Sequence, residues 1–151
     1  MKPHLVIGLG NRLMGDEGVG CLLAERLASD PRLPTDIEIF VGGTDLLASA
    51  DRMAGRARVT LLDALLDPSE PGMVHVFEGD FSALETSQPG AHALSAVASL
   101  QLLQAAYPEL RDVQFKLITV SIDSASFGPG LSAPLAATLH HLLDEVLHNL
   151  A

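Results

Sequence analysis

The feature that most constrains the fold is a glycine-rich segment directly after the first apolar run of the chain. An apolar stretch over residues 4–9 ends at a glycine, and two adjacent carboxylates, Asp16 and Glu17, follow at the predicted start of a helix. In nucleotide-binding proteins such a turn lets a phosphate approach the helix N-terminus, where backbone N–H groups favour an anion. Here the chain supplies its own anions at that place. The segment therefore predicts a first βα turn that meets a metal or another cationic group.

Strand and helix patterns alternate along most of the chain. Short apolar or β-branched runs predict strands over 4–9, 36–41, 57–62, 73–77 and 114–121, and periodic apolar spacing predicts helices over 17–29, 45–54, 92–107 and 132–149. Only the strand over 73–77 follows its predecessor without a helix, so we expect it to be antiparallel or at an edge. The pattern is typical of an α/β fold, a three-layer αβα sandwich with a largely parallel, twisted five-stranded sheet and helices on both faces.

Length and charge limit the classes of partner. A chain of 151 residues predicts one domain over 1–151, and 48% hydrophobic residues are enough for a real core. The net charge of −10 argues against nucleic acid and against an anionic membrane surface, and suits a cation or a basic protein segment. The single cysteine, Cys21, excludes an intramolecular disulfide and is expected to be a small core residue. The absence of a long apolar run or signal peptide predicts a cytoplasmic protein.

Three polar groups are expected at one edge of the predicted sheet. Ligands of open parallel sheets bind beyond the carboxyl ends of the strands. Glu17, next to Asp16, follows the first strand, Asp63 ends the third, and His92 opens the long helix. Two carboxylates and an imidazole suit a divalent transition metal that keeps open coordination positions. Each residue also has an ordinary structural interpretation, because acids and histidines are common at helix starts and strand ends.

Other candidate sites are weaker. His140, Asp144 and His148 have helical metal-stripe spacing but lie off the leucine face, which indicates a solvated surface. Ser121, Ser124 and Ser126 lack a Gly-x-Ser-x-Gly elbow, and no base can be assigned to any of them. The first turn begins like a dinucleotide fingerprint, but its third glycine is misplaced and no acidic residue ends the second strand. We therefore do not expect a serine nucleophile or a nicotinamide cofactor.

The same residues resemble a known family. The chain contains the pattern Gly8-x-Gly10-Asn11-x-Leu13-x-x-Asp16-Glu17-Gly18-x-Gly20, followed in order by Gly42-Gly43-Thr44, Asp63, His92 and the loop over 122–134. This arrangement is similar to that of the hydrogenase maturation endopeptidases, and the similarity extends over essentially the whole chain. One difference is Val41, which stands where the family commonly has an acidic residue before Gly-Gly-Thr. Asp45 is a candidate to replace it in substrate recognition.

The resemblance implies a hydrolase, a metal-dependent or aspartyl-type endopeptidase, that makes a single cut. Its expected protein partner is the large-subunit precursor of a NiFe hydrogenase, which loses a C-terminal extension after nickel insertion. Glu17, Asp63 and His92 correspond to the family positions thought to contact that nickel, and Asp16 matches a supporting acidic position. The carboxylate of either Asp16 or Glu17 is the candidate general base. The expected metal is nickel supplied by the substrate and not tightly held by the free enzyme.

Two other functions remain open from the sequence. One is a non-enzymatic module that binds a metal or a peptide on the same fold. The other is a metal-dependent hydrolase of another amide, such as the tail of a peptidyl-tRNA, whose family also begins with Gly-x-Gly-Asn. The acidic charge and the lack of an Asn-Pro-Gly continuation argue against that second alternative.

Overall fold

A computed structural model describes residues 1–79, 91–124 and 128–150, and for residues 91–95 it describes the backbone alone. The strands are β1 (His4–Leu9), β2 (Ile37–Gly43), β3 (Arg58–Leu66), β4 (Val74–Glu78) and β5 (Gln114–Ile122). The α-helices are α1 (Val19–Ala28), α2 (Ala50–Met53), α4 (Ala91–Ala106), α5 (Ala133–Ala137) and α6 (Leu139–His148), and the short 3₁₀ turns are η1 (Gly15–Gly18), η2 (Leu47–Ser49) and η3 (Pro108–Asp112).

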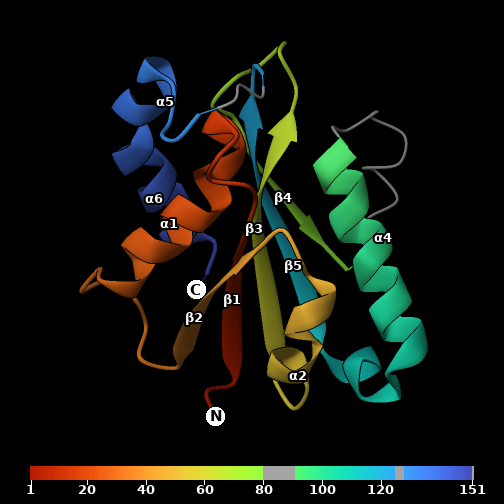
Figure 1. Cartoon of the computed structure of the whole chain (residues 1–151). Coiled ribbons are helices and arrows are strands. Elements are labelled where there is room, and N and C mark those ends of the chain that lie inside the picture. The colour runs from red at the N-terminus through yellow and green to blue at the C-terminus, as the bar shows by residue number, and fades with distance from the viewer. Residues whose placement is uncertain (80–90, 125–127, 151) are drawn as a thin grey trace.

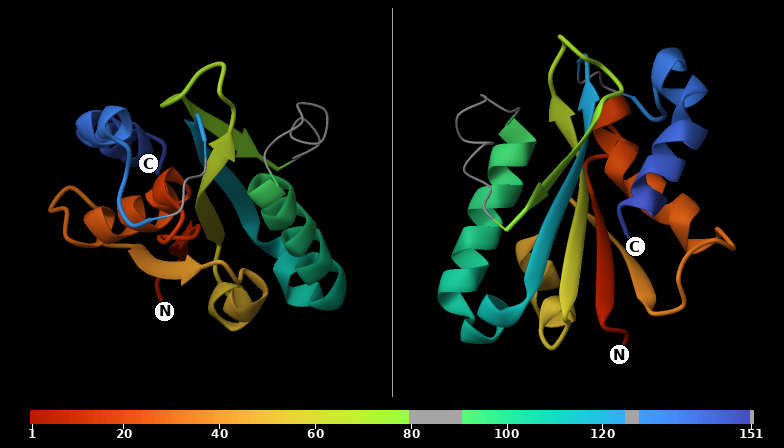
Figure 2. Two further views of the ribbon diagram at one scale, coloured as in Figure 1. Left: turned by 45° about the horizontal axis from the view of Figure 1, so that its top comes forward. Right: turned by 180° about the vertical axis from the view of Figure 1, so that it is seen from behind.

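The strands form one sheet between two helical layers, as the sequence predicts. The strand order is β2-β1-β3-β5-β4, and every neighbouring pair is parallel except β4 with β5. The sequence predicted that the strand over 73–77 would be antiparallel or at an edge of the sheet. In the structure it is both. Helices α1, α5 and α6 lie on one face of the sheet, and α2 and α4 lie on the other (Figures 1 and 2).

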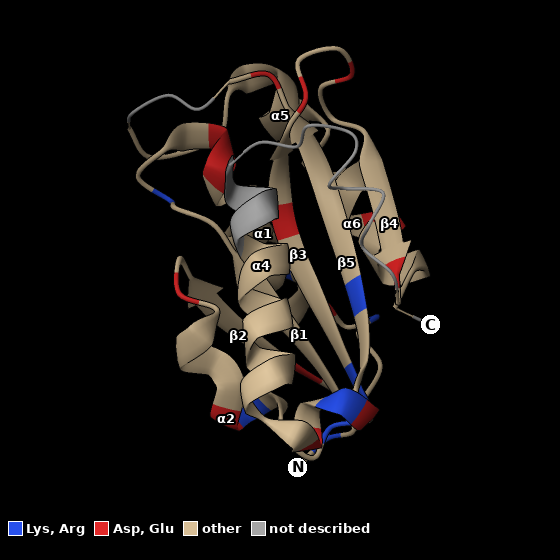
Figure 3. Ribbon diagram, turned by 90° about the vertical axis from the view of Figure 1, so that its right-hand side faces the viewer, with Lys and Arg blue, Asp and Glu red and all other residues tan. Residues whose placement is uncertain are grey.

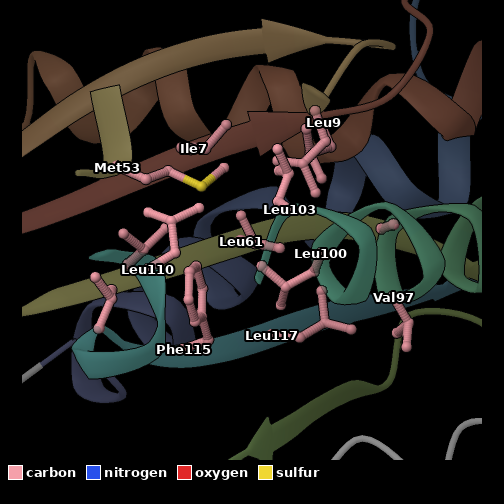
Figure 4. Packing of buried hydrophobic residues seen from close by; sticks show 14 of the residues in the cluster. Ile7, Leu9, Met53, Leu61, Val97, Leu100, Leu103, Leu110, Phe115 and Leu117 are labelled. Atoms are coloured by element: carbon pink, nitrogen blue, oxygen red, sulfur yellow. The ribbon is translucent and has the colours of Figure 1, made fainter. Parts of the chain in front are cut away.

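Each face of the sheet buries its own apolar cluster. Under α2 and α4, alternate residues of the central strands pack against the helices, and Figure 4 shows Ile7, Leu61 and Leu117 pointing into this layer toward Leu100 and Leu103. The other residues of the same strands face α1 and α6. Both faces of β1, β3 and β5 are thus buried over most of their length, which is why β1 is an almost continuous apolar run rather than an alternating one.

Strand β3 is longer than its sequence pattern predicts, and this changes the position of Asp63. The pattern places Asp63 at the strand end, whereas β3 continues to Leu66. The pairing explains the difference, because β1 pairs with β3 only as far as Leu62, while β5 stays paired with β3 to Leu66. Asp63 is therefore the first residue of β3 beyond its ladder with β1. Asp63 is thus still paired with β5 on one side, whereas on the other side it lies just past the end of the pairing with β1.

The segment after β2 also differs from expectation. Gly42 and Gly43 complete β2 instead of forming a separate turn, and the register with β1 shifts at this point. The predicted helix over 45–54 is reduced to η2 and the single turn of α2. At the start of this segment, the Asp45 carboxylate accepts a hydrogen bond from the backbone N–H of Ala48 at 3.2 Å.

The predicted helix over 132–149 is two helices that break at Thr138. Its backbone leaves the α conformation, and its hydroxyl donates to the carbonyl of Leu135 at 3.1 Å. A side-chain hydroxyl that bonds to the preceding turn competes with the helix ladder, which accounts for the break. Over the described part of the chain, none of the helices has the length and apolar content needed to cross a membrane.

Candidate functional site at the carboxyl ends of β1 and β3

Glycines seat the acidic turn against the sheet. A Cβ on Gly10, which has φ +128°, would lie 2.0 Å from the carbonyl oxygen of Glu17. A Cβ on Gly20 would lie 2.4 Å from the carbonyl oxygens of both Leu9 and Leu62. These distances leave no room for any side chain, so the glycines of the motif permit backbone contact between η1, α1 and the ends of β1 and β3. They allow the turn to pack closely, which positions the carboxylates. In a nucleotide-binding turn, by contrast, the glycines make room for a phosphate.

Asp16 joins the acidic turn to the loop that follows β5. Its carboxylate is 8% exposed and accepts two hydrogen bonds from Ser132, one from the backbone N–H at 2.7 Å and one from the hydroxyl at 2.8 Å. Two backbone hydrogen bonds flank this contact, from Gly15 N–H to the Gly128 carbonyl at 2.8 Å and from Gly128 N–H to the Leu13 carbonyl at 2.7 Å. Asp16 therefore fixes the turn in place.

This contact can be measured as a coupling energy. We expect Asp16→Asn to lower the free energy of unfolding by about 1–3 kcal/mol, because the two hydrogen bonds to an ionised carboxylate are worth more than those to a neutral amide. Ser132→Ala removes the hydroxyl bond alone and should cost less. Urea unfolding of both single variants and the double variant gives the coupling in a double-mutant cycle. Strictly additive effects would contradict a direct Asp16–Ser132 interaction.

Asp63 is held on the face of the sheet that α4 covers. Its side chain is 3% exposed, and one carboxylate oxygen accepts a hydrogen bond from the backbone N–H of Ala64 at 2.8 Å. In the sheet register, Asp63 lies opposite Thr119 of β5. Aspartates are almost never fully buried in proteins unless they are paired. Its burial at the open end of a strand ladder marks it as a functional candidate.

A small cavity lies beside Asp63. It has a volume of about 30 Å³, enough for one water molecule or one ion. The lining residues come from the ends of β1, β2 and β3 and from α4: Leu9, Gly10, Gly43, Thr44, Leu46, Asp63, Ala96 and Ser99. Four elements distant in sequence thus meet at this point. It is the position where the strand order reverses, between β1 and β3, and ligands bind there in open α/β sheets.

The structure describes Glu17 in full but His92 by its backbone alone, and both belong to elements next to β3 or the cavity beside Asp63. Glu17 lies in η1, which packs against β3, and its side chain is half-buried. His92 occupies the first turn of α4, one helical turn before the cavity residue Ala96, but its side chain lies outside the described part of the structure. Among the side chains that are described, no group of three His, Cys, Asp or Glu is arranged to hold a metal ion. The three-ligand site involving His92 stays a prediction.

The other sequence candidates are placed as structural or surface residues. Cys21 is buried, and burial raises the pKa of its thiol, which disfavours the thiolate needed for attack or metal binding. The stripe of His140, Asp144 and His148 is exposed, and Asp144 pairs with Arg32 at 2.7 Å. Ser121 is buried in β5, and the predicted loop position Ser126 falls outside the described residues.

The two ends of the sheet differ in charge. Figure 3 shows acidic segments around the carboxyl end of the sheet and most of the basic segments at the opposite end. One basic side chain near the acidic turn, Arg12, is paired with Glu25. This polarity favours a cationic ligand or a basic protein surface at the end of the sheet that carries Asp63.

Sequence comparisons match the chain to one family over most of its length. The family model described as hydrogenase maturation protease, HycI, matches residues 21–149. The hydrogenase 2 maturation protease of Escherichia coli (strain K12) is 30% identical over 149 residues, which cover 95% of this chain and 87% of that protein. The hydrogenase expression/formation protein HupD of Rhizobium leguminosarum bv. viciae is 28% identical over 95% of this chain and 71% of that protein.

Structural comparisons agree with the sequence matches. The NiFe hydrogenase maturation protease HybD from Thermococcus kodakarensis superposes with a TM-score of 0.80 at 27% identity and covers 98% of both chains. The hydrogenase maturating endopeptidase HybD from E. coli has the same TM-score at 29% identity, over 97% of this chain and 91% of that one. The α/β fold predicted from the sequence is thereby confirmed.

Proposed function

Because the chain belongs to the hydrogenase maturation protease family, we propose that it removes the C-terminal extension of a NiFe hydrogenase large-subunit precursor after nickel has entered that subunit. The family assignment makes the chain an endopeptidase and therefore a hydrolase. The observation that supports a metal-directed cut is the placement of buried Asp63 beside an ion-sized cavity at the strand ends. The acidic turn containing Glu17 packs against the same strand.

In this proposal the nickel belongs to the substrate. The precursor presents a nickel ion with open coordination positions, and the carboxylates of Glu17 and Asp63 and the imidazole of His92 bind it. Carboxylate oxygens and imidazole nitrogens are ordinary ligands of such an ion. This contact places the scissile peptide at the carboxyl ends of β1 and β3. The substrate's nickel then either polarises the scissile carbonyl or acidifies a bound water.

The proposed division of work between the two neighbouring acids follows from their contacts. Both lone-pair-bearing oxygens of Asp16 already accept hydrogen bonds from Ser132. Glu17 is half-buried in the same turn, against the strand that carries Asp63. We propose that Glu17, whose turn packs against the strand that carries Asp63, is the general base that takes a proton from the attacking water, and that Asp16 holds this turn in place.

Nickel dependence of the cut is the direct test. Purified protein is mixed with the precursor in nickel-loaded and nickel-free forms, and conversion is followed by the change in gel mobility. We expect cleavage of the loaded precursor alone, and well under one metal equivalent on the free enzyme, because a site of two carboxylates and one imidazole is weak without substrate ligands.

The controls separate the parts of the proposal. Equal cleavage of both precursor forms would contradict the nickel checkpoint while leaving the protease assignment intact. Cleavage of neither form, with stable binding of the precursor, would favour a non-enzymatic binding module. Binding that disappears at high salt would identify charge as the main attraction to the acidic end.

A further inference from the structure

Two buried hydroxyls near Asp63 are left without partners. The Oγ1 of Thr119 and the Oγ of Ser121 are fully buried, and neither has a hydrogen-bond partner within the described structure. Burying a hydroxyl without a hydrogen bond is unfavourable, and such groups in native proteins are rare. Valine at 119 or alanine at 121 would fill nearly the same space without that cost. The retained hydroxyls therefore call for an explanation other than packing.

Thr119 is the cross-strand neighbour of Asp63. The register of β3 and β5 pairs these two residues. Both are two positions beyond the residues Leu61 and Leu117, which Figure 4 shows pointing toward α4, so both project from that same face. Side chains at paired positions of adjacent strands, about 4.8 Å apart, are within reach of each other. The hydroxyl can thus reach the Asp63 carboxylate by a change of its own torsion angle.

The Thr119 hydroxyl is in a position to orient the carboxylate of Asp63. The ion-sized cavity lies beside Asp63, and the backbone N–H of Ala64 holds one carboxylate oxygen. Carboxylates that bind a metal ion are themselves oriented by hydrogen bonds from a second layer of residues. Among the residues that the structure describes, the Thr119 hydroxyl makes no such bond.

We propose that Thr119 is a positioning residue for Asp63, whose carboxylate receives a hydrogen bond from the Thr119 hydroxyl when the substrate's cation occupies the neighbouring cavity. The proton stays on the threonine, and no bond is made or broken at this residue. This inference rests on the proposed function, because the cation belongs to the precursor. The unfavourable burial in the free protein is offset only in the complex, which links the hydroxyl to catalysis rather than to folding.

Thr119→Val tests the inference because it keeps the shape and removes only the hydroxyl. We expect an unchanged or higher Tm together with a fall of about 10–100-fold in the single-turnover rate of precursor cleavage. Thr119→Ser restores the hydroxyl and loses a buried methyl group, so it should cleave at near the wild-type rate with a lower Tm. A role in stability alone predicts instead a lower Tm for Thr119→Val than for Thr119→Ser, and equal cleavage rates for the two folded variants.

Two matched controls use the same chemistry elsewhere in the sheet. Ser121→Ala removes an equally buried, unpartnered hydroxyl that lies opposite Leu65 instead of a carboxylate, so it should raise Tm and leave cleavage unchanged.

Thr60→Val removes a buried hydroxyl that is bonded to His4 at 2.8 Å near the other end of the sheet. Burial lowers the pKa of His4 to about 4, so this imidazole is neutral and loses its partner in the variant. We expect a lower Tm and normal cleavage.

The outcomes decide between the two proposals. Wild-type cleavage by Thr119→Val, or a clear fall in its Tm, would overturn the positioning role and leave the proposed function standing. A slower Ser121→Ala would also overturn it, since the effect would then not depend on proximity to Asp63. If the wild-type protein leaves nickel-loaded precursor intact, the proposed function fails, and the inference about Thr119 fails with it.

Discussion

Replacing Asp63 with asparagine is expected to slow precursor cleavage by at least about 100-fold while the fold stays intact. The amide oxygen can still accept the hydrogen bond from the Ala64 N–H, so the local geometry is preserved. What is lost is the negative charge beside the cavity, and an uncharged amide is a much poorer ligand for the substrate's nickel. Glu17→Gln should have an effect of similar size, because it removes both a proposed ligand and the proposed base.

The measurement is the single-turnover rate with nickel-loaded precursor, at matched far-UV circular dichroism. Asp45→Asn is an informative comparison, since it neutralises an exposed acid after β2 whose carboxylate accepts a backbone hydrogen bond from Ala48. It should leave the rate within a few-fold unless Asp45 replaces the acid that the family commonly carries at the position of Val41. A normal rate for Asp63→Asn would remove Asp63 from the mechanism.

Gly20→Ala is expected to lower the free energy of unfolding by about 3 kcal/mol. The added Cβ would lie 2.4 Å from two backbone carbonyl oxygens, those of Leu9 and Leu62. Neither oxygen can move freely, because each belongs to a central strand, so α1 itself must shift away from the sheet. Forced overpacking of this kind commonly costs 1–3 kcal/mol, and contact with two backbone atoms places this site at the upper end.

Urea unfolding measures this effect, and Gly42→Ala supplies the comparison. Its Cβ would meet a side-chain atom, the Cγ2 of Ile7 at 2.9 Å, which can adjust more easily than backbone. We expect a smaller loss of stability there. Equal stability of Gly20→Ala and the wild-type protein would contradict the close packing of α1 against β1 and β3.

The order of elements was determined by local sequence patterns. Buried strands and amphipathic helices have different apolar periods, so the alternation predicts the parallel sheet and its two helical layers. The first turn was predictable for the same reason, because its glycines and its adjacent acids Asp16 and Glu17 all lie within one short segment. The deviations occur where local preference is weak, as in the reduction of residues 45–54 to η2 and α2 and the break at Thr138.

Tertiary structure alone decided what each polar residue contacts. Sequence placed Asp63 at the end of a strand, but only the unequal lengths of its two ladders put it inside β3 and next to Thr119. No local pattern reveals that Asp16 bonds to Ser132, since 116 residues separate them. Nothing in the sequence distinguishes Thr119 from any other residue of the strand over 114–121. Sequence periodicity determines which way a side chain faces, whereas register between distant strands determines which polar groups meet, and that register is set only when the whole sheet assembles.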